Sequence, residues 1–111
     1  MRLTFAPIAF TSTCATEILN RDFIKMPELS RFFGITIYMF YEDHAPPHFH
    51  ARYGEFEALI RIADFAILDG KLPARALGLV VEWASLHQEE LLENWKHAQS
   101  GEPIAKISPL Q

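Results

Sequence analysis

The sequence contains a single cysteine, Cys14, which excludes an internal disulfide and a zinc site built from several cysteines. A reducing, cytoplasmic compartment is the simplest expectation for such a chain. Acidic residues outnumber basic residues, so the formal net charge is −4 with the histidines neutral. Proteins that clamp a nucleic-acid backbone are usually basic, so broad phosphate binding is disfavoured, while a local nucleic-acid site stays open.

A long apolar run is missing as well. Residues 3–10 are mostly apolar, but Pro7 interrupts them and they fall far short of the roughly 20 residues that a membrane-spanning helix needs. We therefore expect no membrane association. Half of the 111 residues are hydrophobic and 22% are charged, which is the balance of an ordinary globular protein. A chain of this length predicts one domain with one core.

The pattern of the chain becomes regular only after Met26-Pro27, which resembles a second translation start. We therefore expect residues 1–25 to be an N-terminal extension or arm, and residues 26–111 to form a single α+β domain. The extension carries large apolar side chains such as Phe5 and Phe23, which are costly to leave in water. We expect these side chains to pack as an arm or an edge strand.

Four segments have the composition of β-strands, and they comprise residues 34–41, 48–53, 56–62 and 65–68. The first is rich in β-branched and aromatic residues, which predicts a strand buried on much of both faces. Gly54-Glu55 predicts a tight hairpin between the second and third strands. In the third, Ala58 and Ile60 lie on the face expected to meet the core. Asp69-Gly70 is a turn signal after the fourth, and residues 104–107 alternate like one more strand.

A single long helix is predicted from Pro73 to about Ser100, because proline suits the first helical position and Gly101 suits a stop. Apolar residues recur at helical spacing and form one stripe that should face the sheet; they are Leu77, Val80, Val81, Ala84, Leu91, Trp95 and Ala98. The elements together predict an α+β fold of two layers, in which a three- or four-stranded, mainly antiparallel sheet packs on one long C-terminal helix.

The first half of this helix carries further apolar residues outside the main stripe, namely Leu79, Trp83 and Leu86. A helix that is apolar nearly all round needs a cover besides the sheet. We expect these three residues to bind a partner. The N-terminal extension, a second copy in a homo-oligomer and another small protein are the three candidates.

Three of the five histidines fall within residues 43–50, together with Asp43 and a Pro-Pro pair. Proline lacks a backbone donor and fixes φ, so the pair should end one strand and hold a rigid turn. His48 and His50 are two residues apart, so on an extended strand their imidazoles share one face. The sequence therefore indicates where recognition or chemistry takes place, without naming the reaction.

Metal binding is one interpretation of this cluster. His48 and His50 would supply two ligands of a divalent metal such as zinc, and His44 or Asp43 would complete a three-ligand set with water in an open position. The pattern matches no established motif such as His-Glu-x-x-His. In the alternative interpretation, the histidines cap the turn and pair across strands through ordinary hydrogen bonds.

Acid–base catalysis is the second interpretation, and a ribonuclease-like hydrolase is the enzyme it predicts. Metal-free RNA cleavage needs a base, an acid and a cation, which are available in His44, His48, His50 and Arg52. Arg52 alternates onto the same strand face as the two strand histidines, but it could equally be an exposed residue paired with Glu55 or Glu57. His87 either leans towards the Pro-Pro loop or is half-buried with a partner of its own.

The chain resembles the domain-of-unknown-function 4160 family over about residues 26–110, whereas residues 1–25 fall outside the family pattern. The resemblance rests on Met26-Pro27, on His44-Ala45-Pro46-Pro47-His48-Phe49-His50-Ala51, on Gly70-Lys71-Leu72-Pro73 and on the helix residues from Trp83 to Trp95. Genes of this family often lie beside a second small gene, so the resemblance implies a bacterial, cytoplasmic protein with a small partner in a two-protein, toxin–antitoxin-like system. It implies no reaction, cofactor or catalytic residue. Three classes stay open: a toxin-like enzyme, a non-catalytic protein-binding module and a His/Asp metal-binding domain.

Overall fold

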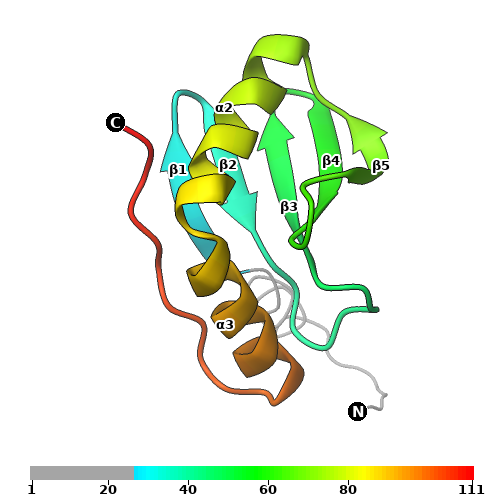
Figure 1. The fold of residues 1–111 in the computed structure, drawn as a ribbon, viewed down its shortest axis with the longest axis vertical. Coiled ribbons are helices and arrows are strands. Elements are labelled where there is room, and N and C mark those ends of the chain that lie inside the picture. Colours follow the sequence, from blue (N-terminus) through cyan, green and yellow to red (C-terminus); the bar gives the residue numbers. More distant parts are fainter. Residues whose placement is uncertain (1–26) are drawn as a thin grey trace, which may run out of the picture.

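The computed structural model of the protein describes residues 27–111, so the predicted extension at residues 1–25 lies outside the described residues. A five-stranded antiparallel sheet has the strand order β1-β2-β3-β4-β5, and two helices follow it in the chain (Figure 1). The elements are β1 (Glu28–Phe32), β2 (Ile35–Tyr38), β3 (His48–Tyr53), β4 (Phe56–Arg61), β5 (Ile67–Lys71), α2 (Ala74–Leu86) and α3 (Gln88–Gln99). Each strand pairs with the next strand along the chain, so the sheet is a simple meander.

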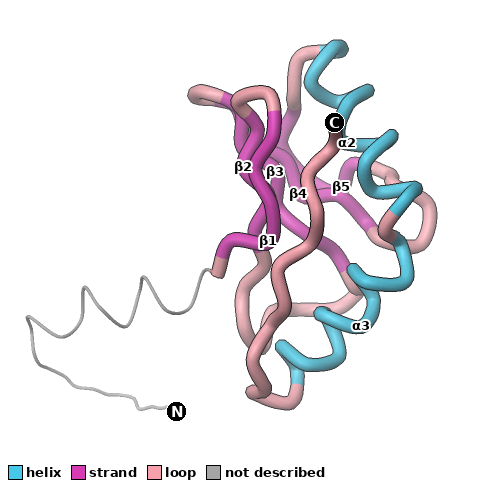
Figure 2. The backbone as a smooth tube through the Cα atoms, turned by 90° about the vertical axis from the view of Figure 1, so that its left-hand side faces the viewer, coloured by secondary structure: helices cyan, strands magenta, loops and turns pink. Residues whose placement is uncertain are grey.

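The structure has two layers, because both helices lie on the same side of the sheet (Figure 2). The core lies between these layers. On β3, Phe49 and Ala51 are fully buried, and on β4 Ala58 and Ile60 are fully buried, as the alternation of these strands predicts. Trp83 of α2 packs edge-on against Phe49, with ring centroids 6.0 Å apart. The predicted α+β fold of two layers is therefore confirmed.

The number of strands differs from the prediction. β1 was not predicted, because its sequence Glu-Leu-Ser-Arg-Phe has little β-branched or aromatic character. β5 extends through Asp69-Gly70, where the sequence predicts a turn. Gly70 has a φ of +78°, and a Cβ atom there would lie 2.1 Å from the carbonyl oxygen of Glu57. The glycine therefore serves a close, irregular strand pairing with β4 and does not end the strand.

The prediction of one long helix is wrong, because the chain breaks between α2 and α3 at His87, which has φ −127° and ψ 27°. No glycine or proline marks this break, so local sequence gives no sign of it. A tertiary contact accompanies the break: the side-chain amide of Gln88 donates to the carbonyl oxygens of Ile62 and Ala63, at 2.7 and 3.1 Å. Of the helices that the structure describes, none has the length and apolar character needed to cross a membrane.

Trp83 is covered by segments of the described chain itself. The indole is fully buried, its ring lies 5.5 Å from that of Phe32, and its Nε1 donates to the carbonyl oxygen of Ser108 at 2.8 Å. The C-terminal segment of the same chain therefore covers this side of α2. Leu79 is only partly buried and Leu86 is 66% exposed, so these two remain available to a partner.

The C-terminal segment is held by side-chain and backbone contacts and contains no strand, contrary to the alternation of residues 104–107. The amide of Asn94 both donates to and accepts from the backbone of Ala105, at 2.9 and 3.0 Å. The backbone N–H of Ile107 donates to the carbonyl oxygen of Leu29 at 2.8 Å. A single backbone bond to β1 is too little for a ladder, but it places Ile107 in the core.

We predict that Trp83→Ala lowers the free energy of unfolding by about 3–5 kcal/mol, because the substitution leaves a large cavity in the core. Leu86→Ala, on the same helix, is the matched control and should change this free energy by less than about 0.5 kcal/mol, because its side chain is exposed. Urea unfolding of the two variants provides the comparison. Equal effects would show that α2 packs with a different face.

We also predict that a chain starting at Met26 folds cooperatively, because the described hydrophobic core extends from Leu29 to Ile107. Thermal unfolding of the shortened and full-length chains is the measurement. Loss of the cooperative transition on shortening would mean that the first 25 residues contribute to the core.

Candidate functional site

The Pro-Pro loop, residues 39–47, joins β2 to β3 and is held at several points. The backbone N–H of Ile62 donates to the carbonyl oxygen of Pro47 at 3.0 Å, and the N–H of Glu42 donates to that of Ala98 at 3.3 Å. The side-chain amide of Gln99 donates to the carbonyl oxygen of Asp43 at 3.2 Å. The loop is therefore fixed both to the sheet and to the end of α3, although it has no regular structure of its own.

His48 and His50 lie on the same face of β3, opposite to the face on which Phe49 meets the core. Their ring centroids are 5.3 Å apart. Both residues are buried, at 4% and 5% exposure. Aromatic rings surround them: Trp95 lies 5.2 Å from the ring of His48, while Tyr38 stacks on His50 at 5.0 Å. The two imidazoles are thus held in fixed orientations.

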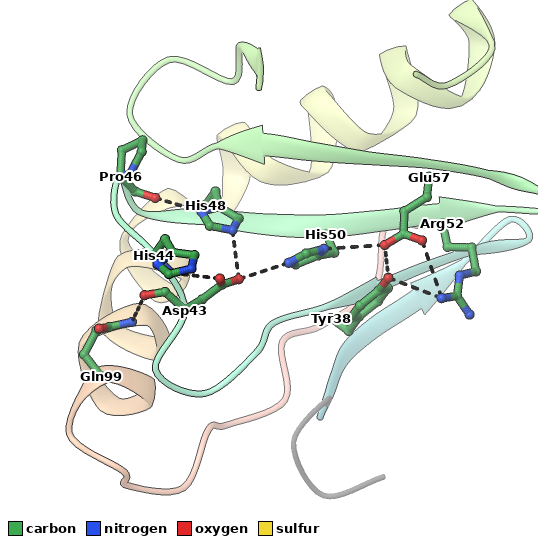
Figure 3. Close-up of polar contacts among 9 residues, drawn as sticks. All are labelled: Tyr38, Asp43, His44, Pro46, His48, His50, Arg52, Glu57 and Gln99. Carbon is green, nitrogen blue, oxygen red and sulfur yellow. Dashed lines mark hydrogen bonds and ion pairs between the residues drawn. The ribbon is translucent and has the colours of Figure 1, made fainter. Parts of the chain in front are cut away.

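The carboxylate of Asp43 lies between the two imidazoles. Its Oδ1 accepts the backbone N–H of His44 at 2.8 Å. Its Oδ2 lies 3.0 Å from Nε2 of His48 and 3.3 Å from Nε2 of His50 (Figure 3). Asp43, His48 and His50 each offer one ligand atom, and these three atoms all lie within 4.8 Å of one another.

Three further residues continue this arrangement across the sheet. Oε2 of Glu57 lies 3.5 Å from Nδ1 of His50, which is too long for a good hydrogen bond. The hydroxyl of Tyr38 donates to Oε2 of Glu57, and the guanidinium of Arg52 donates to the Tyr38 oxygen at 3.3 Å. We call the whole set the polar row; it consists of Asp43, His48, His50, Glu57, Tyr38 and Arg52 (Figure 3).

The ionisation of the polar row follows from these contacts. Burial, together with the neighbouring Glu57 carboxylate, raises the pKa of Tyr38 to about 12, so the phenol is protonated and can donate. Burial alone raises the pKa of Asp43, but the N–H of His44 and the two imidazoles outweigh it, so the net shift is downward. For Glu57, burial also raises the pKa, while the Tyr38 hydroxyl, Arg52 and His50 bring it below its ordinary value. Both carboxylates are therefore ionised at neutral pH.

The predicted site residues are only partly brought together. His48 and His50 converge with Asp43, but His44 is exposed and does not belong to the group that could share one ion. Arg52 lies on the predicted face and contacts Tyr38 and, at 3.6 Å, Glu57. Of the two alternatives for the third ligand, the structure thus brings Asp43, and not His44, next to the two strand histidines.

His87 does not lean towards the loop. Its Nδ1 lies 2.5 Å from Oε1 of Glu90, and its ring lies against Trp83 at the helix break. Glu57 and Tyr38 were not predicted as site residues. The register of the β3–β4 hairpin, in which Arg52 pairs with Glu57, could have indicated Glu57. Tyr38 pairs with His50 between β2 and β3, and the long Pro-Pro loop that joins these strands does not reveal their register.

We predict that Asp43→Asn removes a stabilisation that depends on pH. Because the pKa of Asp43 is lower in the folded chain than in the unfolded chain, its ionised form stabilises the fold above the unfolded pKa. This stabilisation is lost as pH falls through the folded pKa. The difference in unfolding free energy between the wild type and Asp43→Asn should therefore shrink from roughly pH 4 downward.

Urea unfolding in metal-free buffer over a series of pH values measures this difference. Glu89→Gln, an exposed change on α3, is the control. A difference that stays constant between neutral pH and about pH 3 would contradict the assigned ionisation of Asp43.

Comparison with known proteins gives one match. The family model described as Domain of unknown function (DUF4160) matches residues 34–96, which is more than half of the chain and includes the whole polar row. No curated protein and no solved structure matches the chain. The extent of the family match identifies this chain as a member of the DUF4160 family.

Proposed function

We propose that this protein is one component of a two-protein, toxin–antitoxin-like system of the bacterial cytoplasm, and that the polar row is its working surface. The observation that supports the proposal is the convergence of six polar side chains from β2, β3, β4 and the Pro-Pro loop on one face of the sheet. Burying polar groups lowers stability unless they are paired. Such an arrangement is more typical of a functional site than of a structural core.

Access to the row is uneven. The side chains of Arg52 and Glu57 are 50% and 39% exposed, whereas that of Asp43 is 18% exposed and those of His48 and His50 are 5% and 6% exposed. A ligand would therefore meet the guanidinium and the Glu57 carboxylate first. In an enzyme of the ribonuclease-like class, Arg52 would hold the phosphate and the histidines would transfer protons. In a recognition module, the same end would bind a charged group.

The surface for the protein partner is proposed beside the Arg52 end of β3, on the opposite face of the sheet. Phe33 is 60% exposed and Tyr53 is 39% exposed, and both line a hollow of about 380 Å³ with Leu79 and Arg75. Leu79 was expected to bind a partner from its position in the sequence. Exposed aromatic residues beside an arginine are typical of protein-binding surfaces.

Growth of a bacterial host tests the proposal. If the protein is the toxic member, induced expression should slow growth, and the double variant His48→Ala with His50→Ala should restore it while remaining folded. His97→Ala is the matched control, because this histidine lies on α3 and pairs with Glu102 outside the polar row. Growth arrest that persists in the folded double variant would contradict a catalytic role of the row.

Co-purification with the product of the neighbouring gene tests the pairing. If the protein is the neutralising member, the histidine variants should leave growth unchanged, whereas Leu79→Glu should abolish the complex. Leu92→Glu, at an exposed leucine of α3, provides a comparison of equal charge. Failure of the wild-type chain to co-purify would count against a two-protein system.

A further inference from the structure

We propose that Asp43, His48 and His50 bind one divalent transition-metal ion of the zinc class, through Oδ2 of the aspartate and Nε2 of each histidine. This proposal depends on the geometry of the three residues and not on the two-protein system. It concerns the buried end of the polar row, whereas Arg52 lies at the exposed end.

The separations of the donor atoms fit a shared ion. Zinc binds imidazole nitrogen and carboxylate oxygen at roughly 2.0–2.2 Å, so two ligands at angles between 90° and tetrahedral lie about 2.9–3.4 Å apart. The observed distances from Oδ2 of Asp43 are 3.0 Å to Nε2 of His48 and 3.3 Å to Nε2 of His50. Both carboxylate-to-imidazole separations therefore fit a shared ion, and the three donor atoms all lie within 4.8 Å of one another.

The second nitrogen of His48 determines which tautomer the ring adopts. Nδ1 lies 2.8 Å from the carbonyl oxygen of Pro46. A carbonyl oxygen only accepts hydrogen bonds, so Nδ1 carries the hydrogen. In the neutral ring, Nε2 then carries a lone pair, which is the form of imidazole that binds a metal. A cation between Nε2 and Oδ2 of Asp43 would use one lone pair of each atom.

His50 has the same arrangement. Its Nδ1 is buried and has no hydrogen-bond partner, but the carboxylate of Glu57 lies 3.5 Å away. With a metal on Nε2, the hydrogen is on Nδ1 and points towards this carboxylate. Histidine ligands of metals usually direct the other ring nitrogen to a carboxylate or a backbone carbonyl, and the two histidines here show one of each.

A metal-free network with neutral imidazoles accounts for these contacts less well. If Nε2 of His50 donates to Asp43 in a neutral ring, the lone pair on Nδ1 is left facing the Glu57 carboxylate in a buried position. With a shared cation on Nε2, the hydrogen on Nδ1 faces this carboxylate instead.

The ligand types select the class of metal. Two imidazoles and one carboxylate suit zinc and its neighbours in the first transition row, whereas Mg²⁺ and Ca²⁺ prefer oxygen ligands alone. Three protein ligands leave a coordination position open, as in catalytic zinc sites. The fixed orientation of the rings between Trp95, Tyr38 and Phe40 makes the site pre-formed.

Metal uptake by the purified full-length protein tests the proposal. After treatment with a chelator and dialysis, the chain should bind one Zn²⁺ or Co²⁺ ion, measured by elemental analysis and by the visible absorption of bound Co²⁺. Asp43→Asn and His50→Gln should each abolish stoichiometric binding. Glu57→Gln should weaken it by about 10–100-fold, as expected for a residue that orients a ligand.

Three control variants should keep wild-type affinity. His44→Ala changes the exposed histidine of the same loop, and His97→Ala changes one on α3. Cys14→Ser tests the single thiol, because thiolates bind zinc. A wild-type chain that takes up no Zn²⁺ or Co²⁺ overturns the proposal, as does uptake that is unchanged in Asp43→Asn or lost in a control.

If a ligand variant fails to fold, a measurement on the wild-type protein still tests the metal site. The Nε2 signals of His48 and His50 in nitrogen-15 spectra of the wild-type protein should shift together when one equivalent of Zn²⁺ is added. A shift confined to His44 or His97 overturns the assignment. These measurements do not use bacterial growth, so they test the metal site independently of the proposed two-protein system.

Discussion

The central strand β3 determines how the core and the polar row are related, because successive side chains of a strand point to opposite faces. Phe49 and Ala51 enter the core, and His48 and His50 therefore point away from it. β3 pairs with β2 on one side and with β4 on the other. A slip of one residue would exchange the faces of Phe49 and the two histidines, so the packing of the core also fixes the position of the imidazoles.

The end of α3 contributes to the same site through the Pro-Pro loop. Gln99 and Ala98 hydrogen-bond to the backbone of Asp43 and Glu42, and Trp95 lies against His48. The position of the Asp43 carboxylate thus depends on a helix that is more than 40 residues away in the sequence. The break at His87 separates α3 from α2, and only α3 contacts the loop through these bonds.

The C-terminal segment covers part of the apolar surface of α2 that lies outside its main apolar stripe. Trp83 contacts Phe32, Phe49 and the carbonyl oxygen of Ser108, so the chain covers this helix face itself. Of the large apolar side chains of α2, Leu86 remains exposed, and exposed apolar side chains elsewhere include Phe33. The contrast shows why a surplus of apolar residues on a predicted helix does not by itself indicate a binding surface.

The sequence alone predicted the α+β class, β3, β4 and the hairpin between them, because alternation and turn residues act over a few neighbouring positions. It also predicted that His48 and His50 share one face, since this follows from a period of two. The tertiary structure alone decided the fifth strand, the break at His87 and the burial of Trp83, which depend on contacts between distant segments. It likewise decided the partners of the two histidines. Asp43 lies next to the two histidines because its loop is hydrogen-bonded to α3, while Glu57 and Tyr38 lie on the neighbouring strands β4 and β2. Strand register and long-range hydrogen bonds set these positions, and neither can be derived from local composition.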